Sequence, residues 1–202
     1  PLPEVPFEAC RKASTISNSL SLVRFDNNDY SVPVRYAHHP IVIKGYFERV
    51  ELCHQDQVVA IHQRIWEKER VSFEPIHYLS LLERKPSAFD YARPLEGWDL
   101  PECFSVLRRR LETEQGGEGT REYIRVLRLL EKHSLRMLKR AIEKALAVRA
   151  HSRDAIAQFI WPREEWRTRT FSLDGRDHLR HLRVERPDVR SYNILREGGA
   201  RV

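Results

Sequence analysis

The spacing of apolar residues changes along this chain from a strand period to a helix period, and the change falls near Pro75. Between residues 20 and 66, short apolar stretches alternate with polar residues, and turn-forming clusters separate them at residues 26–29 and 55–57. Such alternation is typical of half-buried strands, while Asn and Asp favour tight turns. About four or five short strands in this span predict a small β-barrel of SH3-like size over residues 21–72.

The individual strands of this region can be placed from their alternation. One is expected at residues 30–35, where Tyr30, Val32 and Val34 alternate with other residues. Pro33 places that strand at a sheet edge, because proline has no N–H to donate to a neighbour. Further strands are expected at residues 41–46, 50–52 and 58–62. Residues 1–20 contain three prolines and a polar run, so they are predicted to be an extended connector with little regular structure.

Beyond Pro75, apolar residues recur every three or four positions, which predicts a helical region over residues 75–160. A short helix is expected at residues 77–82 and is ended by Pro86, since the residue before a proline disfavours helical geometry. A longer helix is expected from Pro101, which suits a first helical turn, to about residue 114.

A glycine-rich break at residues 115–119 precedes the longest helical pattern of the chain. Thr120 is the expected N-cap of a helical stretch that runs to about residue 150. Ser134 offers an alternative, because it can cap a new helix and split this stretch into two. Ser152 is expected to cap a last helix over residues 153–160.

The rest of the chain, residues 161–202, is predicted to be a basic C-terminal tail with little core of its own. The predicted fold class is therefore α+β, with a small SH3-like β-barrel followed by a helical bundle and an irregular basic tail. The net charge of +6 is concentrated in the second half. Residues 116–160 carry +5 and the tail carries +3, whereas the first 115 residues carry −2.

Composition excludes several classes of protein. Apolar residues make up 41% of the chain, which is too much for a disordered sequence, and no apolar run is long enough to span a membrane. The cysteines, Cys10, Cys53 and Cys103, are odd in number and far apart. They do not form a disulfide framework, and a reducing cytoplasm is the expected location.

A basic ridge follows if residues 121–148 form one helix. Its members are three or four positions apart and therefore share one side; they are Arg121, Arg125, Arg128, Lys132, Arg136 and Lys139. Apolar residues occupy the opposite side. Such a ridge suits the phosphates of a nucleic-acid backbone, and a solvated surface beside a core is the alternative. A new helix at Ser134 would divide the ridge into two patches.

No catalytic motif is present in the chain. It lacks a phosphate-binding P-loop, a GxGxxG dinucleotide motif and a GxSxG nucleophile motif. The histidine pairs at residues 38–39 and at His178 and His181 have no Cys or carboxylate partners at ligand spacing. The chain is thus expected to have no enzymatic activity, no bound metal and no cofactor of its own.

Several short motifs occur in a characteristic order along residues 1–160. They are Leu22–Phe25 with Asn28–Pro33, Val59–Arg64, His77–Pro86, Gly119–Leu127 and Ala141–Leu146. In this order and spacing they resemble the C-terminal part of IstA-type insertion-sequence transposases. Those proteins are DDE transposases that are related to phage Mu transposase and work with the IstB ATPase.

The resemblance implies a role in transposition without the chemistry itself. An IstA-type protein carries a helix-turn-helix and an RNase H-like domain whose DDE carboxylates bind Mg²⁺, and both are expected upstream of Pro1. No DDE residue can be assigned to this chain. The resemblance further implies a nucleoid-associated protein whose partners are double-stranded transposon-end DNA, other transposase subunits and an IstB-type ATPase.

Candidate DNA contacts are the basic residues of three regions. They are Arg24, Arg35, Lys44, Arg64, Lys68 and Arg70 around the barrel, Arg84 and Lys85 after the short helix, and Arg121, Arg125, Arg128, Lys132, Arg136 and Lys139 of the ridge. Two other functions stay open: a module that pairs subunits or docks the ATPase, and a truncated transposase that regulates the intact protein.

Overall fold

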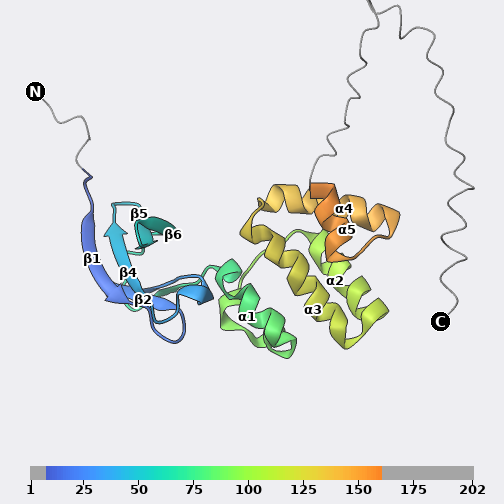
Figure 1. The fold of residues 1–202 in the computed structure, drawn as a ribbon, viewed down its shortest axis with the longest axis horizontal. Helices are drawn as coiled ribbons and strands as arrows, with labels where there is room; N and C mark the ends of the chain where they lie inside the picture. Colours follow the sequence, from blue (N-terminus) through green and yellow to red (C-terminus); the bar gives the residue numbers. More distant parts are fainter. Residues whose placement is uncertain (1–7, 161–202) are drawn as a thin grey trace, which may run out of the picture. The chain divides into compact units, whose positions relative to one another are not determined.

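The computed structural model describes residues 8–160 and shows strands followed by helices (Figure 1). Within the described residues, seven strands form two sheets. The first has the order β1-β4-β5-β6 and is antiparallel throughout; its strands are β1 Arg11–Ile16, β4 Pro40–Gly45, β5 Arg49–His54 and β6 Gln57–Gln63. The second has the order β2-β3-β7; its strands are β2 Leu22–Phe25, β3 Asn28–Ser31 and β7 Val71–Ser72.

Both predicted turns are confirmed, and their geometry explains the residues found there. Asp26 and Asn27 join β2 to β3 with φ of 48° and 62°, and Gln55 and Asp56 join β5 to β6 with φ of 47° and 61°. Two-residue hairpin turns with positive φ at both positions match the twist of the paired strands. Asn and Asp tolerate that conformation better than most residues.

The interior of the sheets confirms the predicted alternation. Tyr30, Ile43, Val50 and Leu52 are fully buried and form one apolar cluster with their neighbours. Gly45 is required beside this cluster, because a Cβ at that position would lie 2.3 Å from the Phe25 ring.

Two expectations for this region are wrong. Residues 11–16 form β1 rather than an irregular connector, because their backbone pairs with the open edge of β4 from Arg11↔Gly45 to Ile16↔Pro40. The strand expected at residues 30–35 ends at Ser31, since the chain after Pro33 turns into the 3₁₀ helix η1 Val34–Tyr36. The predicted small SH3-like unit is present as two hydrogen-bonded sheets, and the described strands do not close into a full barrel.

The α+β class is confirmed by the helices that follow. They are η2 Pro75–Tyr78, α1 Leu79–Arg84, η3 Pro86–Tyr91, η4 Arg93–Leu95, α2 Glu102–Gln115, α3 Gly117–Leu127, η5 Arg128–Glu131, α4 Leu135–Val148 and α5 Arg153–Ile160. Pro101 is the residue just before α2, close to its predicted place. None of the helices in residues 8–160 is long and apolar enough to cross a bilayer. The predicted domain boundaries stay predictions, and the tail lies outside the described residues.

The start of α3 differs from the prediction. The helix begins at Gly117 after Gly116, whose φ of 58° breaks the chain direction between α2 and α3. Thr120 is therefore inside the helix, where its hydroxyl donates to the Glu112 carboxylate at 3.0 Å rather than capping an end. Gly119 lets α2 and α3 approach closely, because a Cβ there would lie 2.3 Å from the Leu111 carbonyl oxygen.

The split at Ser134 is confirmed. The stretch after Gly119 ends in η5, and Ser134 caps α4 by accepting a hydrogen bond from the Met137 N–H at 3.4 Å. Residues 121–148 are consequently two helices with different directions, and the ridge expected on one helix is divided into two patches.

A largely buried polar cluster joins strands β3 and β6 to the 3₁₀ helix η2. The Ser31 hydroxyl lies 2.9 Å from His77 Nδ1 and accepts a hydrogen bond from the Glu74 N–H at 2.9 Å. His62 Nε2 donates to the Ser31 carbonyl at 2.7 Å. Burial, together with the nearby His62, lowers the pKa of His77 to about 3, and burial also lowers the pKa of His62. Both rings are therefore neutral at pH 7.

We expect this cluster to make the fold sensitive to acid. An unfolded histidine has a pKa of about 6.5, so protonation of His77 favours the unfolded chain between about pH 6.5 and pH 3. The stability that the neutral His77 contributes is fully present above pH 6.5 and is lost as the pH falls towards 3. Urea unfolding should show a loss of about 1–2 kcal/mol from pH 7 to pH 5.

The variant His77→Asn keeps a hydrogen-bond acceptor but cannot titrate, so this pH dependence should be clearly smaller. The matched control is His38→Asn, which changes an exposed histidine with a φ of 63° that asparagine tolerates. An unchanged slope in His77→Asn would contradict the assignment.

Candidate nucleic-acid interface

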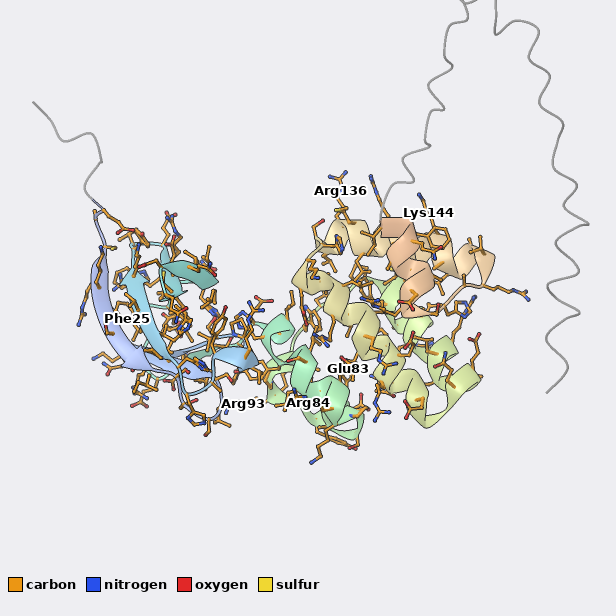
Figure 2. All side chains as sticks on the ribbon, viewed as in Figure 1. Phe25, Glu83, Arg84, Arg93, Arg136 and Lys144 are labelled. Carbon is orange, nitrogen blue, oxygen red and sulfur yellow. The ribbon has the colours of Figure 1, made fainter. Side chains whose placement is uncertain are left out.

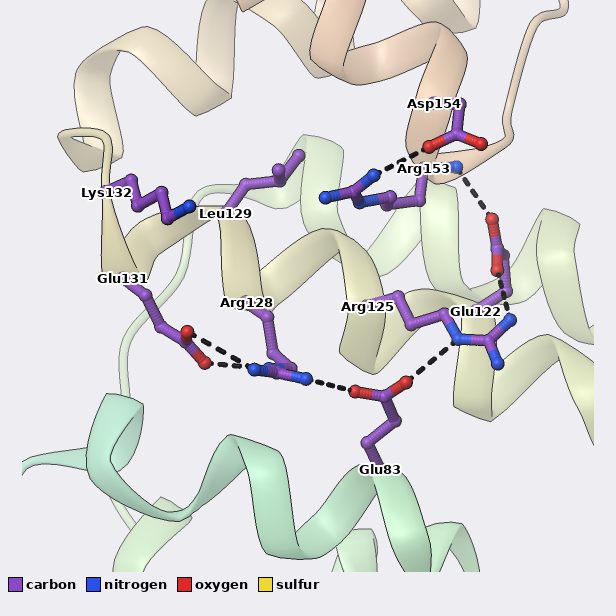
Figure 3. A pocket seen from close by; sticks show the side chains of 9 residues that line it. All are labelled: Glu83, Glu122, Arg125, Arg128, Leu129, Glu131, Lys132, Arg153 and Asp154. Atoms are coloured by element: carbon purple, nitrogen blue, oxygen red, sulfur yellow. Dashed lines mark hydrogen bonds and ion pairs between the residues drawn. The ribbon is translucent and has the colours of Figure 1, made fainter. Parts of the chain in front are cut away.

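The arginines of α3 and η5 are held in ion pairs with neighbouring acids (Figure 3). Glu83 of α1 accepts from Arg125 Nε at 3.0 Å and from Arg128 Nη1 at 2.6 Å. Arg128 also binds Glu131 at 2.7 Å. Nearer the start of α3, Arg121 Nη1 donates to Glu118 Oε2 at 2.6 Å.

Glu83 is the centre of this network. Partial burial raises the pKa of its carboxyl group, but the hydrogen bonds from Arg128 and Arg125 outweigh it and lower the pKa overall. The carboxylate is only 22% exposed and connects α1 to α3 and η5. The positive charge of the first patch of the predicted ridge is therefore largely compensated by acids, and its arginines hold helices together.

The second patch lies on α4 and is different. Leu138, Ala141, Ile142 and Ala145 are fully buried, so the opposite side of the helix faces solvent. Four exposed cations occupy that side, which we call the α4 basic face: Arg136, Lys139, Arg140 and Lys144. Figure 2 shows Arg136 and Lys144 extending from α4 away from the other helices.

The α4 basic face keeps most of its charge. Within residues 8–160, its one ion pair joins Lys139 Nζ to Glu143 Oε1 at 3.9 Å, between side chains that are each about half exposed. Exposed pairs of this kind contribute little. The face thus offers several cations to an anionic partner, and Lys132, just before α4, is exposed as well.

Arg140 and Lys144 are absent from the residues predicted to contact DNA. They follow Arg136 at intervals of four positions, which places all three on one side of a helix. The spacing is visible in the sequence, but on one continuous helix from residue 121 the basic ridge runs through other positions. With a new helix after Ser134, Arg140 and Lys144 lie on the same side as Arg136.

The basic residues predicted around the strands are mostly paired with acids. Their partners are Asp29 for Arg24 at 3.7 Å, Glu8 for Lys44 at 2.9 Å, Asp26 for Arg64 at 2.6 Å and Glu67 for Arg70 at 2.8 Å. These pairs leave little positive charge on the strands. Lys68 is exposed near the end of this region.

Three predicted residues, one from each predicted region, come together. Arg35 of η1, Arg84 at the end of α1 and Arg128 of η5 line one cavity of about 480 Å³, with Glu74, His77 and Glu131 also in its wall. Arg35 and Arg84 are exposed, as is the neighbouring Lys85. The two acids in its wall make this cavity a less basic site than the α4 basic face.

Among residues 8–160, no group of three or more His, Cys, Asp or Glu side chains could hold a metal ion. The α4 basic face offers positive charge and hydrogen-bond donors, which suit the phosphates of a nucleic acid.

Comparison with known proteins finds similarity to a described family over the part of the chain that contains the strands. Residues 2–74 match the family "Mu transposase, C-terminal domain". A transposase from Aminobacter aminovorans is 25% identical over 198 residues, which are 95% of this chain and 38% of that protein. A transposase for insertion sequences IS1326/IS1353 from Pseudomonas aeruginosa is 27% identical over 159 residues, or 76% of this chain and 31% of that protein, and one from Shigella flexneri matches equally.

The chain spans about a third of the length of these curated relatives. No solved structure matches it. The matches support the expectation of a transposase C-terminal region, and the matching family implies a role in transposition.

Proposed function

We propose that this chain is the non-catalytic, DNA-associated C-terminal region of an IstA-type DDE transposase. It holds double-stranded transposon-end DNA at the bacterial nucleoid, while the Mg²⁺-dependent chemistry belongs to another part of the parent protein. The observation that carries the proposal is the α4 basic face. In the described part of the chain, only one of its four cations, Lys139, lies within 4 Å of an acid, Glu143. The similarity of the chain to transposases supports the choice of DNA as the polyanion.

The dimensions of the face suit a nucleic-acid backbone. Arg136 and Lys144 are eight residues apart, which corresponds to about 12 Å along the helix. That length covers about three to four base-pair steps of duplex DNA. Contacts of this kind go to phosphates and position the protein without reading the sequence.

Salt dependence tests the proposal with the unaltered chain. Four phosphate contacts predict a slope of about −3.6 for log K against log salt, so affinity should fall on the order of a hundredfold from 50 to 200 mM NaCl. Fluorescence anisotropy of a labelled duplex measures this directly. A flat salt response would mean that charge does not hold DNA here.

Assembly is the second candidate function, and a specific feature of α4 favours it. Leu135, Met137 and Val148 flank the basic face and are 40%, 43% and 60% exposed. Such side chains suit contact with another transposase subunit or with an IstB-type ATPase. Light scattering distinguishes the two functions, because a monomer at all concentrations that still binds DNA tightly excludes subunit pairing.

A further inference from the structure

Two aromatic side chains lie exposed together at one end of the first sheet. Phe47 is in the turn between β4 and β5, and Trp66 follows the end of β6. They are 76% and 63% exposed, and their ring centroids are 5.6 Å apart. Large apolar side chains gathered on a surface commonly mark a binding site.

Trp66 is held in place by a cation rather than by the apolar core. The Arg64 guanidinium lies 4.1 Å from the centroid of the Trp66 ring. It is fixed in turn by Asp26 at 2.6 Å and by the Tyr46 carbonyl at 2.7 Å, and its side chain is only 13% exposed. One face of the indole is thus supported by a fixed partner, while much of the ring stays open to solvent.

The two rings border a hollow of about 530 Å³. Its wall also includes the apolar Ile61, the exposed Gln63, Arg49 and the exposed acid Glu48. The hollow therefore combines π surfaces for stacking, an amide that can both donate and accept hydrogen bonds, and a cation at the border. The π surfaces and the amide match the chemistry of a nucleobase.

We propose that this hollow binds an unpaired nucleobase of a DNA strand, stacked on Trp66 and Phe47. The inference rests on the proposed function, since it takes DNA as the partner. The base must be unpaired, because a base within a duplex is already stacked on its neighbours and offers no free face. The cations here are paired, Arg49 with Glu51 at 2.7 Å and Arg64 with Asp26, so stacking rather than phosphate attraction supplies the affinity.

The test compares two DNAs that differ only in unpaired bases. One is a blunt duplex, and the other is the same duplex with a short single-stranded overhang that contains 2-aminopurine. The full chain should bind the overhang DNA more tightly and quench the 2-aminopurine fluorescence. Trp66→Ala and Phe47→Ala should each weaken overhang binding about tenfold, with less than a twofold effect on the blunt duplex.

Two further variants separate stacking from other roles of these residues. Trp66→Tyr keeps an aromatic ring and should restore most of the binding and quenching. Tyr91→Ala removes an aromatic side chain that is 89% exposed on η3, away from the hollow, and should change neither.

Other results would overturn the inference. Equal binding of both DNAs by the unaltered chain would reject base stacking while leaving the proposed function intact, and failure to bind either DNA would reject both. Trp66→Ala that leaves overhang binding unchanged but abolishes self-association in light scattering would assign the hollow to a protein partner instead.

Discussion

The double variant Arg136→Glu/Lys144→Glu is expected to bind duplex DNA about a hundredfold more weakly than the unaltered chain at 100 mM salt. Each substitution removes a phosphate contact and places a like charge near the backbone of the DNA. The salt slope should become less steep by about 2, since two contacts that release counterions are lost. Both side chains are exposed, so circular dichroism should show an unchanged fold.

The matched control reverses two other exposed arginines, Arg93 and Arg109, and so alters the net charge equally. It should weaken binding less than threefold. Neutralising Arg125 and Arg128 to Gln should weaken binding less than the α4 variant, because Glu83 and the other acids around them engage both guanidinium groups. Since these ion pairs join helices, circular dichroism must first show that this variant is folded. If the control variant lost as much affinity as the α4 variant, net charge rather than the α4 basic face would hold the DNA.

Gly119→Ala is expected to destabilise the fold by about 2–3 kcal/mol, a large effect for a single methyl group. The added Cβ would lie 2.3 Å from the Leu111 carbonyl oxygen and 2.6 Å from the Glu112 nitrogen. Both atoms belong to the backbone of α2, so no side-chain rotation relieves the clash and the two helices must separate. Leu111 is fully buried, so their separation would open the core. Urea unfolding followed by circular dichroism measures the loss.

Gly117→Ala provides the comparison within the same helix. A Cβ at Gly117 meets no atom within 4 Å, and alanine has a higher helix propensity than glycine. This variant should be as stable as the unaltered chain, or more stable by up to about 1 kcal/mol. If Gly119→Ala were equally well tolerated, α2 and α3 would not pack as closely as the structure shows.

Much of the secondary structure follows from local sequence. The turn at residues 26–29 is predictable because Asp and Asn adopt positive φ readily, and the helix at residues 153–160 is predictable because Ser152 can cap it. The start of α4 at Ser134 belongs to the same group. These features depend on residues only a few positions apart, which interact whatever the rest of the chain does.

Strand β1 shows where such reasoning fails. Its residues have no strong alternation, and only one side of the strand is partly buried. The strand exists because β4, more than twenty residues later, has unpaired backbone groups at its edge. The sequence of residues 11–16 contains no information about this distant edge, so the strand could not be predicted from it.

The sequence by itself determined that this chain has strands before helices, a basic second half and motifs that resemble a transposase. Only the tertiary structure decided which cations remain available. Glu83 compensates the charges of Arg125 and Arg128, although it is 42 and 45 positions away in the chain, whereas Arg136 and Lys144 stay open to solvent. The reason is physical: an ion pair depends on distance in space, and only the packing of α1 against α3 brings that carboxylate within reach of the arginines.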